Sequence, residues 1–198
     1  RALFAACVCV RSHYAPGPDL DRACDELQAR AAALTEPTLR ERLLVQGALV
    51  TAATERNDQP AILSGRLAEM ELAGQLGLQA QVDAAESNVV FVLIAMGRQG
   101  DAAQRGRALL QRIDAGNASA KGNLPWVLLG LLKALVGMQA LDEAHALVPR
   151  AWAACAQFGV PVVAPVAAQL AALRGRVAAA ALLIGHADEA YAAREMTM

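Results

Sequence analysis

Residues 57–99 read NDQPAILSGRLAEMELAGQLGLQAQVDAAESNVVFVLIAMGRQ, two helix-length segments enclosed by breaks in the pattern. The breaks fall at Asn57, Gly77 and Gln99, and the first two are residue types that tolerate turn conformations. The segments between them are rich in Ala and Leu, which are strong helix formers. This stretch therefore predicts a helical hairpin.

The same kind of break recurs along the chain with a period of about 40 residues. One series of breaks falls at Gly17, Asn57, Gln99, Gln139 and Gly175, and a second, offset by half a period, at Pro37, Gly77, Gly116-Asn117 and Gly159. They define five pairs of helices: 2–13 with 19–34, 38–55 with 59–76, 79–96 with 101–114, 125–138 with 142–158, and 163–173 with 177–194. We expect an all-α fold, a tetratricopeptide-like superhelix of about five antiparallel helix pairs that forms one domain over residues 1–198.

Local signals support these boundaries and raise two exceptions. Acidic residues fit the starts of the second helices of the pairs, where a carboxylate can accept free backbone N–H groups: Asp19, Asp58, Asp101 and Asp142. Small residues early in the second helices would allow close packing on the first: Ala23, Ala61, Ala103, Ala144 and Ala179. Pro149 should kink or split its helix. The apolar run Val89–Ile94 could also form a buried strand, although its place in the repeat favours a helix.

Composition excludes several classes of protein. The chain has 198 residues, a formal net charge of −1 and only 4% aromatic residues, which disfavours direct contact with nucleic acid or an anionic membrane. Its longest apolar stretches are shorter than a membrane span. The cysteines Cys7, Cys9, Cys24 and Cys155 lack disulfide or metal spacing, and we expect them to be buried thiols in a soluble, cytoplasmic protein.

No recognisable constellation of catalytic residues is present. His13, His145 and His186 belong to no metal-binding pattern, and the chain lacks a phosphate loop, a dinucleotide turn and a nucleophile elbow. We therefore expect no enzyme activity, cofactor or metal. The basic residues Arg98, Arg105 and Arg112, with Arg107 nearby, form a stripe that we interpret as a solvated helix face.

Four residues are candidates for contact with a ligand. They are polar or amphipathic side chains on otherwise apolar first helices of the pairs: Gln46, Asn88, Trp126 and Lys133. First helices line the concave surface of such superhelices, so these side chains could meet a ligand there. The alternative is a structural role, as buried amides or as a lysine whose stem packs on the core.

The last repeat resembles a known family. Leu173-Arg174-Gly175-Arg176 and residues 179–194, AAALLIGHADEAYAAR, are similar to the GR-xxx-AA-x-LLG-x-AD-x-AY stretch near the C-terminus of large ATP-dependent bacterial transcriptional regulators. Those proteins join a winged-helix or LuxR-type DNA-binding domain and a STAND-class ATPase to a tetratricopeptide-like sensor. The resemblance implies a sensor arm that binds an inducer or a partner protein and releases an autoinhibited ATPase.

Two functional hypotheses follow. The first is a non-enzymatic ligand-sensing or protein-interaction domain of a bacterial signalling or transcriptional regulator, whose partners are a protein, peptide or small-molecule inducer and the neighbouring ATPase and DNA-binding domains. The second is a stand-alone protein-interaction scaffold. The chain begins at Arg1, which favours a fragment of a larger protein. The apolar first helix, with Leu3, Phe4, Val8 and Val10, predicts self-association.

Overall fold

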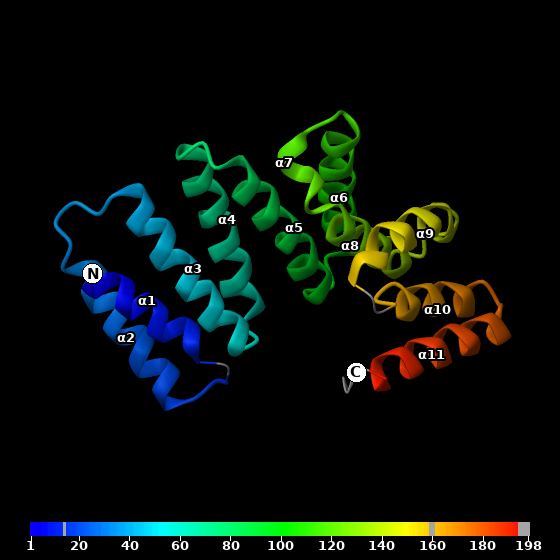
Figure 1. Cartoon of the computed structure of the whole chain (residues 1–198), viewed down its shortest axis with the longest axis horizontal. Helices are drawn as coiled ribbons and strands as arrows, with labels where there is room; N and C mark the ends of the chain where they lie inside the picture. Colours follow the sequence, from blue (N-terminus) through cyan, green and yellow to red (C-terminus); the bar gives the residue numbers. More distant parts are fainter. Residues whose placement is uncertain (14, 159–160, 194–198) are drawn as a thin grey trace. The chain divides into compact units, whose positions relative to one another are not determined.

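The computed structural model describes residues 1–13, 15–158 and 161–193, and all of their regular structure is helical (Figure 1). No strand occurs in these ranges, so the prediction of an all-α fold is confirmed, and the run Val89–Ile94 is helical. The elements are α1 Ala2–Ser12, α2 Pro18–Ala32, α3 Leu39–Glu55, α4 Gln59–Gln75, α5 Gln79–Ala95, α6 Gln99–Asp114, α7 Ala118–Lys121, α8 Leu124–Gly137, α9 Leu141–Cys155, the 3-10 turn Ala156–Phe158, α10 Ala164–Leu173 and α11 Val177–Ala192.

The predicted helix boundaries agree with these elements, with three differences. The short helix α7 was not predicted, and Gln99 begins α6, so the break before α6 lies at Gly97. Helix α9 continues through Pro149, which was expected to kink or split it, so the proline, at an exposed position, does not split the helix. The predicted break at Gly159 lies outside the described residues.

Left-handed residues end the helices at the predicted breaks. The φ angle is +54° at Asn57, +69° at Gly77 and +59° at Gln139. At each of these ends the following backbone N–H reaches back over the last turn: Asp58 N–H donates to the Ala53 carbonyl at 3.0 Å, Leu78 to Ala73 at 2.9 Å and Ala140 to Leu135 at 2.9 Å. This six-residue closure is the Schellman arrangement, which satisfies carbonyls that the helix leaves free.

The helix starts are capped less uniformly than the sequence predicts. Asp58 caps α4, since its carboxylate accepts the Ala61 N–H at 3.0 Å, and Thr38 with Glu41 forms a capping box at the start of α3. The other three predicted aspartates lie in the first turn of their helices, where they face the positive end of the helix dipole without capping it: Asp19, Asp101 and Asp142.

The chain divides into two compact units, Arg1–Met96 and Gly97–Met198. In the first unit α1 packs on α2 and α3, α3 on α4, and α4 on α5. In the second, α8 packs on α6, α9 and α10, and α10 packs on α11. The boundary falls in the turn between α5 and α6, which were predicted as one pair. Contacts of α1 with α3 and of α8 with α10 join first helices of successive pairs.

Close packing between helices depends on small residues, although not on all of those predicted. Ala23, Ala103 and Ala144 are buried, as expected, but Ala61 and Ala179 are exposed. In α4 the close approach lies one turn later, at Gly65. A Cβ there would overlap Val50 Cγ2 and lie 2.9 Å from Gln46 Nε2, both on α3. Gly65 therefore takes the role that the sequence assigned to Ala61.

Ion pairs show that α6 and α9 run parallel. Arg107 Nε donates to Glu143 Oε1 at 2.8 Å, and Arg150 Nη1 donates to Asp114 Oδ2 at 3.0 Å; the partners are 36 residues apart in both pairs. A constant offset between two helices requires that both run in the same direction. Second helices of successive pairs that run parallel are typical of helical repeats.

Candidate binding cleft

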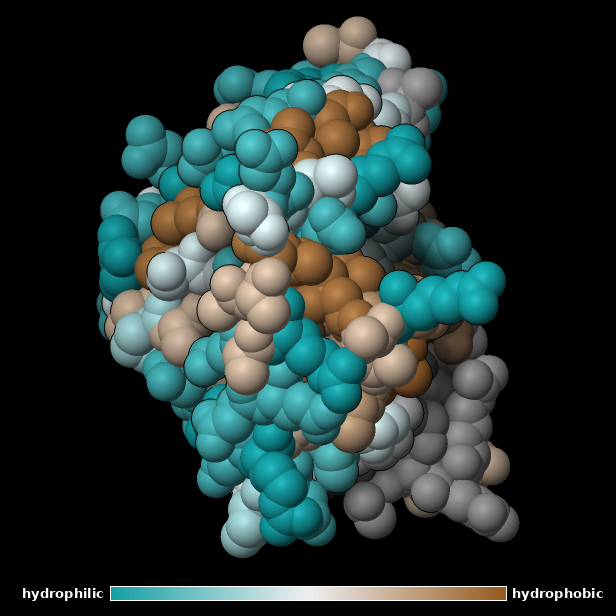
Figure 2. Space-filling view, turned by 90° about the vertical axis from the view of Figure 1, so that its left-hand side faces the viewer, coloured by the Kyte–Doolittle hydropathy of each residue, from teal (hydrophilic) through white to brown (hydrophobic). Residues whose placement is uncertain are grey.

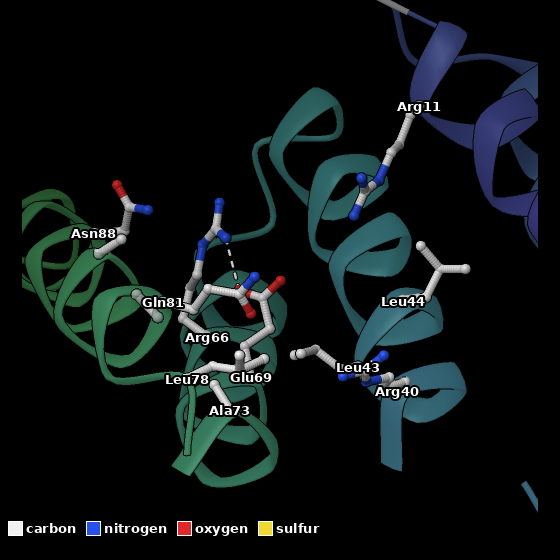
Figure 3. Close-up of a pocket in the computed structure, with 12 residues that line it drawn as sticks. Arg11, Arg40, Leu43, Leu44, Arg66, Glu69, Ala73, Leu78, Gln81 and Asn88 are labelled. Carbon is white, nitrogen blue, oxygen red and sulfur yellow. Dashed lines mark hydrogen bonds and ion pairs between the residues drawn. The ribbon is translucent and has the colours of Figure 1, made fainter. Parts of the chain in front are cut away.

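A cleft of about 490 Å³ opens between α3, α4 and α5 of the first unit (Figure 3). Each helix presents to it residues spaced three, four or seven positions apart, the spacing that places side chains on one helix face. Arg40, Leu43 and Leu44 come from α3; Arg66, Glu69 and Ala73 come from α4; and Gln81, Ala84, Ala85 and Asn88 come from α5. Leu78, in the turn before α5, and Arg11 of α1 complete the lining.

The lining of the cleft is positively charged. It contains the guanidinium groups of Arg11, Arg40 and Arg66 and one carboxylate, that of Glu69, which leaves two positive charges in excess. Arg66 Nη1 lies 2.6 Å from Glu69 Oε2, and both side chains are largely buried. The Arg66 Nε atom is buried and has no hydrogen-bond acceptor among the described residues.

Two of the three arginines have no acidic partner. Neither Arg11 nor Arg40 forms an ion pair or a side-chain hydrogen bond with a described residue. Several other arginines pair with carboxylates, for example Arg30 with Glu26 and Arg107 with Glu143. The guanidinium groups of Arg11 and Arg40 therefore remain available to an anion.

Gly47 allows Arg11 to reach the cleft. Arg11 extends from α1 toward α3 (Figure 3), and a Cβ built on Gly47 would lie 2.5 Å from Arg11 Nη2 and 3.0 Å from Glu69 Oε1. The missing side chain at Gly47 thus leaves the space in which the guanidinium group of α1 approaches the carboxylate of α4.

The four predicted site residues lie in three different places. Asn88 is exposed and lines the cleft. Gln46 lines a second hollow of about 260 Å³ in the same unit, beside Leu34 and Pro37, and its amide packs near Gly65. Trp126 and Lys133 are exposed on α8 of the second unit, and the Trp126 ring lies 4.7 Å from the ring of Phe158.

The sequence analysis missed the arginines of the cleft. Arg11, Arg40 and Arg66 belong to three different helices, and each occurs in a segment where arginine is typical of solvated surface. Arg66 and Glu69 are three residues apart, a spacing that predicts an ion pair on one helix. That spacing was the one local signal of this site, and it does not reveal a cleft.

Two arginines of the basic stripe at α6, Arg98 and Arg107, pair with acidic groups. Arg98 Nε donates to Asp101 Oδ2 at 2.7 Å, and Arg107 forms two hydrogen bonds with the carboxylate of Glu143. The hydrogen bonds from Arg107 hold the pKa of the Glu143 carboxyl below its ordinary value. This partial neutralisation supports the interpretation of the stripe as a helix surface.

The described residues contain no group of three His, Cys, Asp or Glu side chains that could hold a metal ion. His145 and His186 are exposed, and the His186 ring lies 6.4 Å from that of Trp152. Cys7, Cys24 and Cys155 are buried, as predicted, but the prediction was wrong for Cys9, which is exposed because it lies two residues from Cys7 on the opposite side of α1. Burial raises the pKa of the Cys7 and Cys155 thiols, which keeps them protonated.

None of the described helices has the length and apolar composition needed to cross a membrane.

Comparisons of this chain with protein-family models, with curated proteins and with solved structures found no match.

Proposed function

We propose that this chain is a non-enzymatic binding domain, the ligand-sensing or protein-interaction arm of a bacterial signalling or transcriptional regulator. The observation that carries this proposal is the positively charged cleft in the unit Arg1–Met96. Three of its four contributing helices, α1, α3 and α5, are first helices of their pairs. First helices form the concave, ligand-binding side of tetratricopeptide-like superhelices, so the position of the cleft agrees with this architecture.

The regulator part of the proposal draws on the C-terminal segment. The Gly175 of its motif has a φ angle of +74° and separates α10 from α11, so the motif forms a helical hairpin. The motif resembles that of STAND-class regulators in sequence, and a hairpin is the element expected at that place in their sensor arms. Such an arm would bind its inducer or partner protein and relieve autoinhibition of an ATPase domain in the parent protein.

A stand-alone interaction scaffold is the second candidate, and exposed hydrophobic side chains on α1 offer it a contact surface, as they would offer one to a neighbouring domain of a larger protein. Phe4 and Val8 are 61% and 48% exposed, and their spacing of four residues places them on one face of the helix. Figure 2, which views the molecule from the side of α1 and α2, shows hydrophobic surface between hydrophilic side chains. An exposed apolar face of this kind suits contact with another protein.

The native gene product distinguishes the two candidates. We expect a protein much larger than the 20.7 kDa of this chain, with a phosphate-binding loop and ATP hydrolysis whose rate changes when residues 1–198 are deleted. A native product of about this size, without ATP turnover, would refute the regulator and leave the scaffold. The measurements are the mass of the native protein and its ATPase rate, with a phosphate-loop Lys→Ala variant as the control for contaminating activity.

A further inference from the structure

We propose that the cleft between α3, α4 and α5 binds a small organic anion, a molecule with an apolar body and one carboxylate or phosphate head. The guanidinium groups of Arg11 and Arg66, which both lie beside Glu69, would hold the head. Arg40, at the other end of the α3 face (Figure 3), would add to the positive potential, and Leu43, Leu44 and Leu78 would pack on the body. This inference rests on the proposed binding function and assigns the chemical class of the ligand.

The charges of the cleft select an anion. Two guanidinium groups without partners stand beside an Arg66–Glu69 pair, so the lining keeps its positive excess after the internal pair is counted. Guanidinium groups bind carboxylate and phosphate oxygens through charge-assisted hydrogen bonds, often two at a time. A cation would meet the repulsion of three arginines and the attraction of one carboxylate that is already engaged.

Arg66 provides a second, independent sign of a missing acceptor. Its Nη1 atom is held by Glu69 at 2.6 Å, while its Nε atom is buried without an acceptor among the described residues. A buried donor without an acceptor is unfavourable, because it has lost its hydrogen bond to water and gained none in return. An oxygen of the bound head would supply the acceptor that this donor lacks.

The size and apolar part of the cleft select a small molecule with a hydrophobic body. A volume of about 490 Å³ lies within the range of small-molecule sites. The leucines of α3 and of the turn before α5 face this space together with Ala73, Ala84 and Ala85. An inorganic ion would leave this apolar wall exposed, so the ligand must bury hydrocarbon as well as charge. The amides of Gln81 and Asn88 at the α5 wall can bond further polar groups.

The test measures binding of four probes to the whole chain by isothermal titration calorimetry: octanoate, octyl phosphate, the uncharged 1-octanol and inorganic phosphate. We expect saturable binding of octanoate, octyl phosphate or both, at least ten times tighter than that of 1-octanol. Tighter binding of octyl phosphate would assign a phosphate head and tighter binding of octanoate a carboxylate head. Inorganic phosphate should bind more weakly than octyl phosphate, since it lacks the apolar body. Equal affinity for the charged and uncharged probes, or no binding of any probe, would overturn the proposal.

Variants locate the binding site. Arg11→Gln should weaken binding of the preferred charged probe about tenfold, the loss of one charge-assisted contact, and Arg40→Gln should weaken it by a smaller factor, because Arg40 contributes positive potential without touching the head. Arg22→Gln is the matched control, because Arg22 lies in the same unit on α2, outside the cleft lining, and pairs with Asp19 across exposed surface. Unchanged affinity in both cleft variants, or an equal loss in the control, would contradict the proposal.

Gly47→Ala provides a test that keeps every charge. The added Cβ would displace the flexible end of Arg11, so affinity should fall several-fold while the stability of the fold is maintained. Wild-type affinity in this variant would show that Arg11 does not hold the head. These outcomes are separate from those for the regulator, because the mass and ATPase rate of the native product do not depend on the anion.

Discussion

At the residue scale, the turns between helices depend on a few left-handed residues, two of which are not glycine. Asn57 and Gln139 have φ angles of +54° and +59°. A residue with a Cβ is strained in this region by about 1 kcal/mol or more, and Asn tolerates it better than Gln. The turn between α8 and α9 therefore carries the larger local strain.

Gln139→Gly should stabilise the second unit. Glycine adopts the left-handed conformation without a Cβ clash, and we expect a gain of about 0.5–1 kcal/mol in the free energy of unfolding after the entropic cost of glycine in the unfolded chain. Urea denaturation followed by circular dichroism provides the measurement. Gln111→Gly, at an exposed site within α6, is the control and should lose about 1 kcal/mol. A loss of stability in Gln139→Gly would contradict the assignment of this turn.

At the element scale, helix packing explains why two glycines of α4 should respond in opposite ways to the same substitution. A Cβ at Gly65 would overlap Val50 Cγ2 of α3, whereas a Cβ at Gly74 has no neighbour within 4 Å. Gly65→Ala should force α3 and α4 apart and cost about 1–3 kcal/mol. Gly74→Ala should stabilise the helix by up to about 1 kcal/mol. The thermal unfolding midpoints of the two variants provide the measurement. Equal shifts from the wild-type midpoint would show that α3 and α4 do not approach closely at Gly65.

The ion pairs between α6 and α9 make the stability of the second unit depend on pH. Hydrogen bonds from Arg107 and Arg150 lower the pKa of Glu143 and Asp114 in the folded state. The folded state therefore holds fewer protons than the unfolded state in acid, so this stabilisation is present above the ordinary carboxyl pKa and is lost as the pH falls through the lowered values. We expect the urea concentration at the unfolding midpoint to decrease as the pH is lowered from about 5 to about 3.

Arg107→Gln tests the cause of this dependence. The Glu143 carboxyl should return toward its ordinary pKa in the variant, as followed by NMR titration of its side-chain carbonyl carbon, and the acid loss of stability should become smaller. Arg105→Gln, two residues away on α6 and without a carboxylate partner among the described residues, is the matched control. A Glu143 pKa that is the same in wild type and in Arg107→Gln would refute the pair.

At the scale of the whole molecule, the exposed face of α1 predicts self-association. Phe4 and Val8 together expose a hydrophobic strip, and sedimentation velocity should show an average mass that rises with concentration. Val8→Glu should abolish that rise, because it places a charge in the strip. Ala2→Glu adds the same charge on the other exposed side of α1 and should leave the rise unchanged. A concentration-independent monomer mass in the wild type would contradict the prediction.

The sequence predicts the helices of this structure better than it predicts the candidate cleft. The positions of the helices could be predicted from the turn residues, because Gly77, Asn57 and Gln139 each adopt a left-handed conformation that ends the preceding helix. The short helix α7 was not predicted, because a segment of four residues is too short to show a periodic pattern. Of the residues that line the candidate cleft, only Asn88 was predicted as a site residue, because it is a polar residue among apolar neighbours. Arg11, Arg40 and Arg66 are ordinary surface residues within their own helices, and only the packing of four helices gathers them.

The most direct test of binding at the cleft is an amide NMR titration of the whole chain with octanoate and, in parallel, octyl phosphate. The account predicts saturating shifts at Arg40, Leu44, Arg66, Gln81 and Asn88, with the resonances of Trp126 and Lys133 unchanged. Shifts confined to the second unit, or an absence of saturating shifts with both probes, would contradict it.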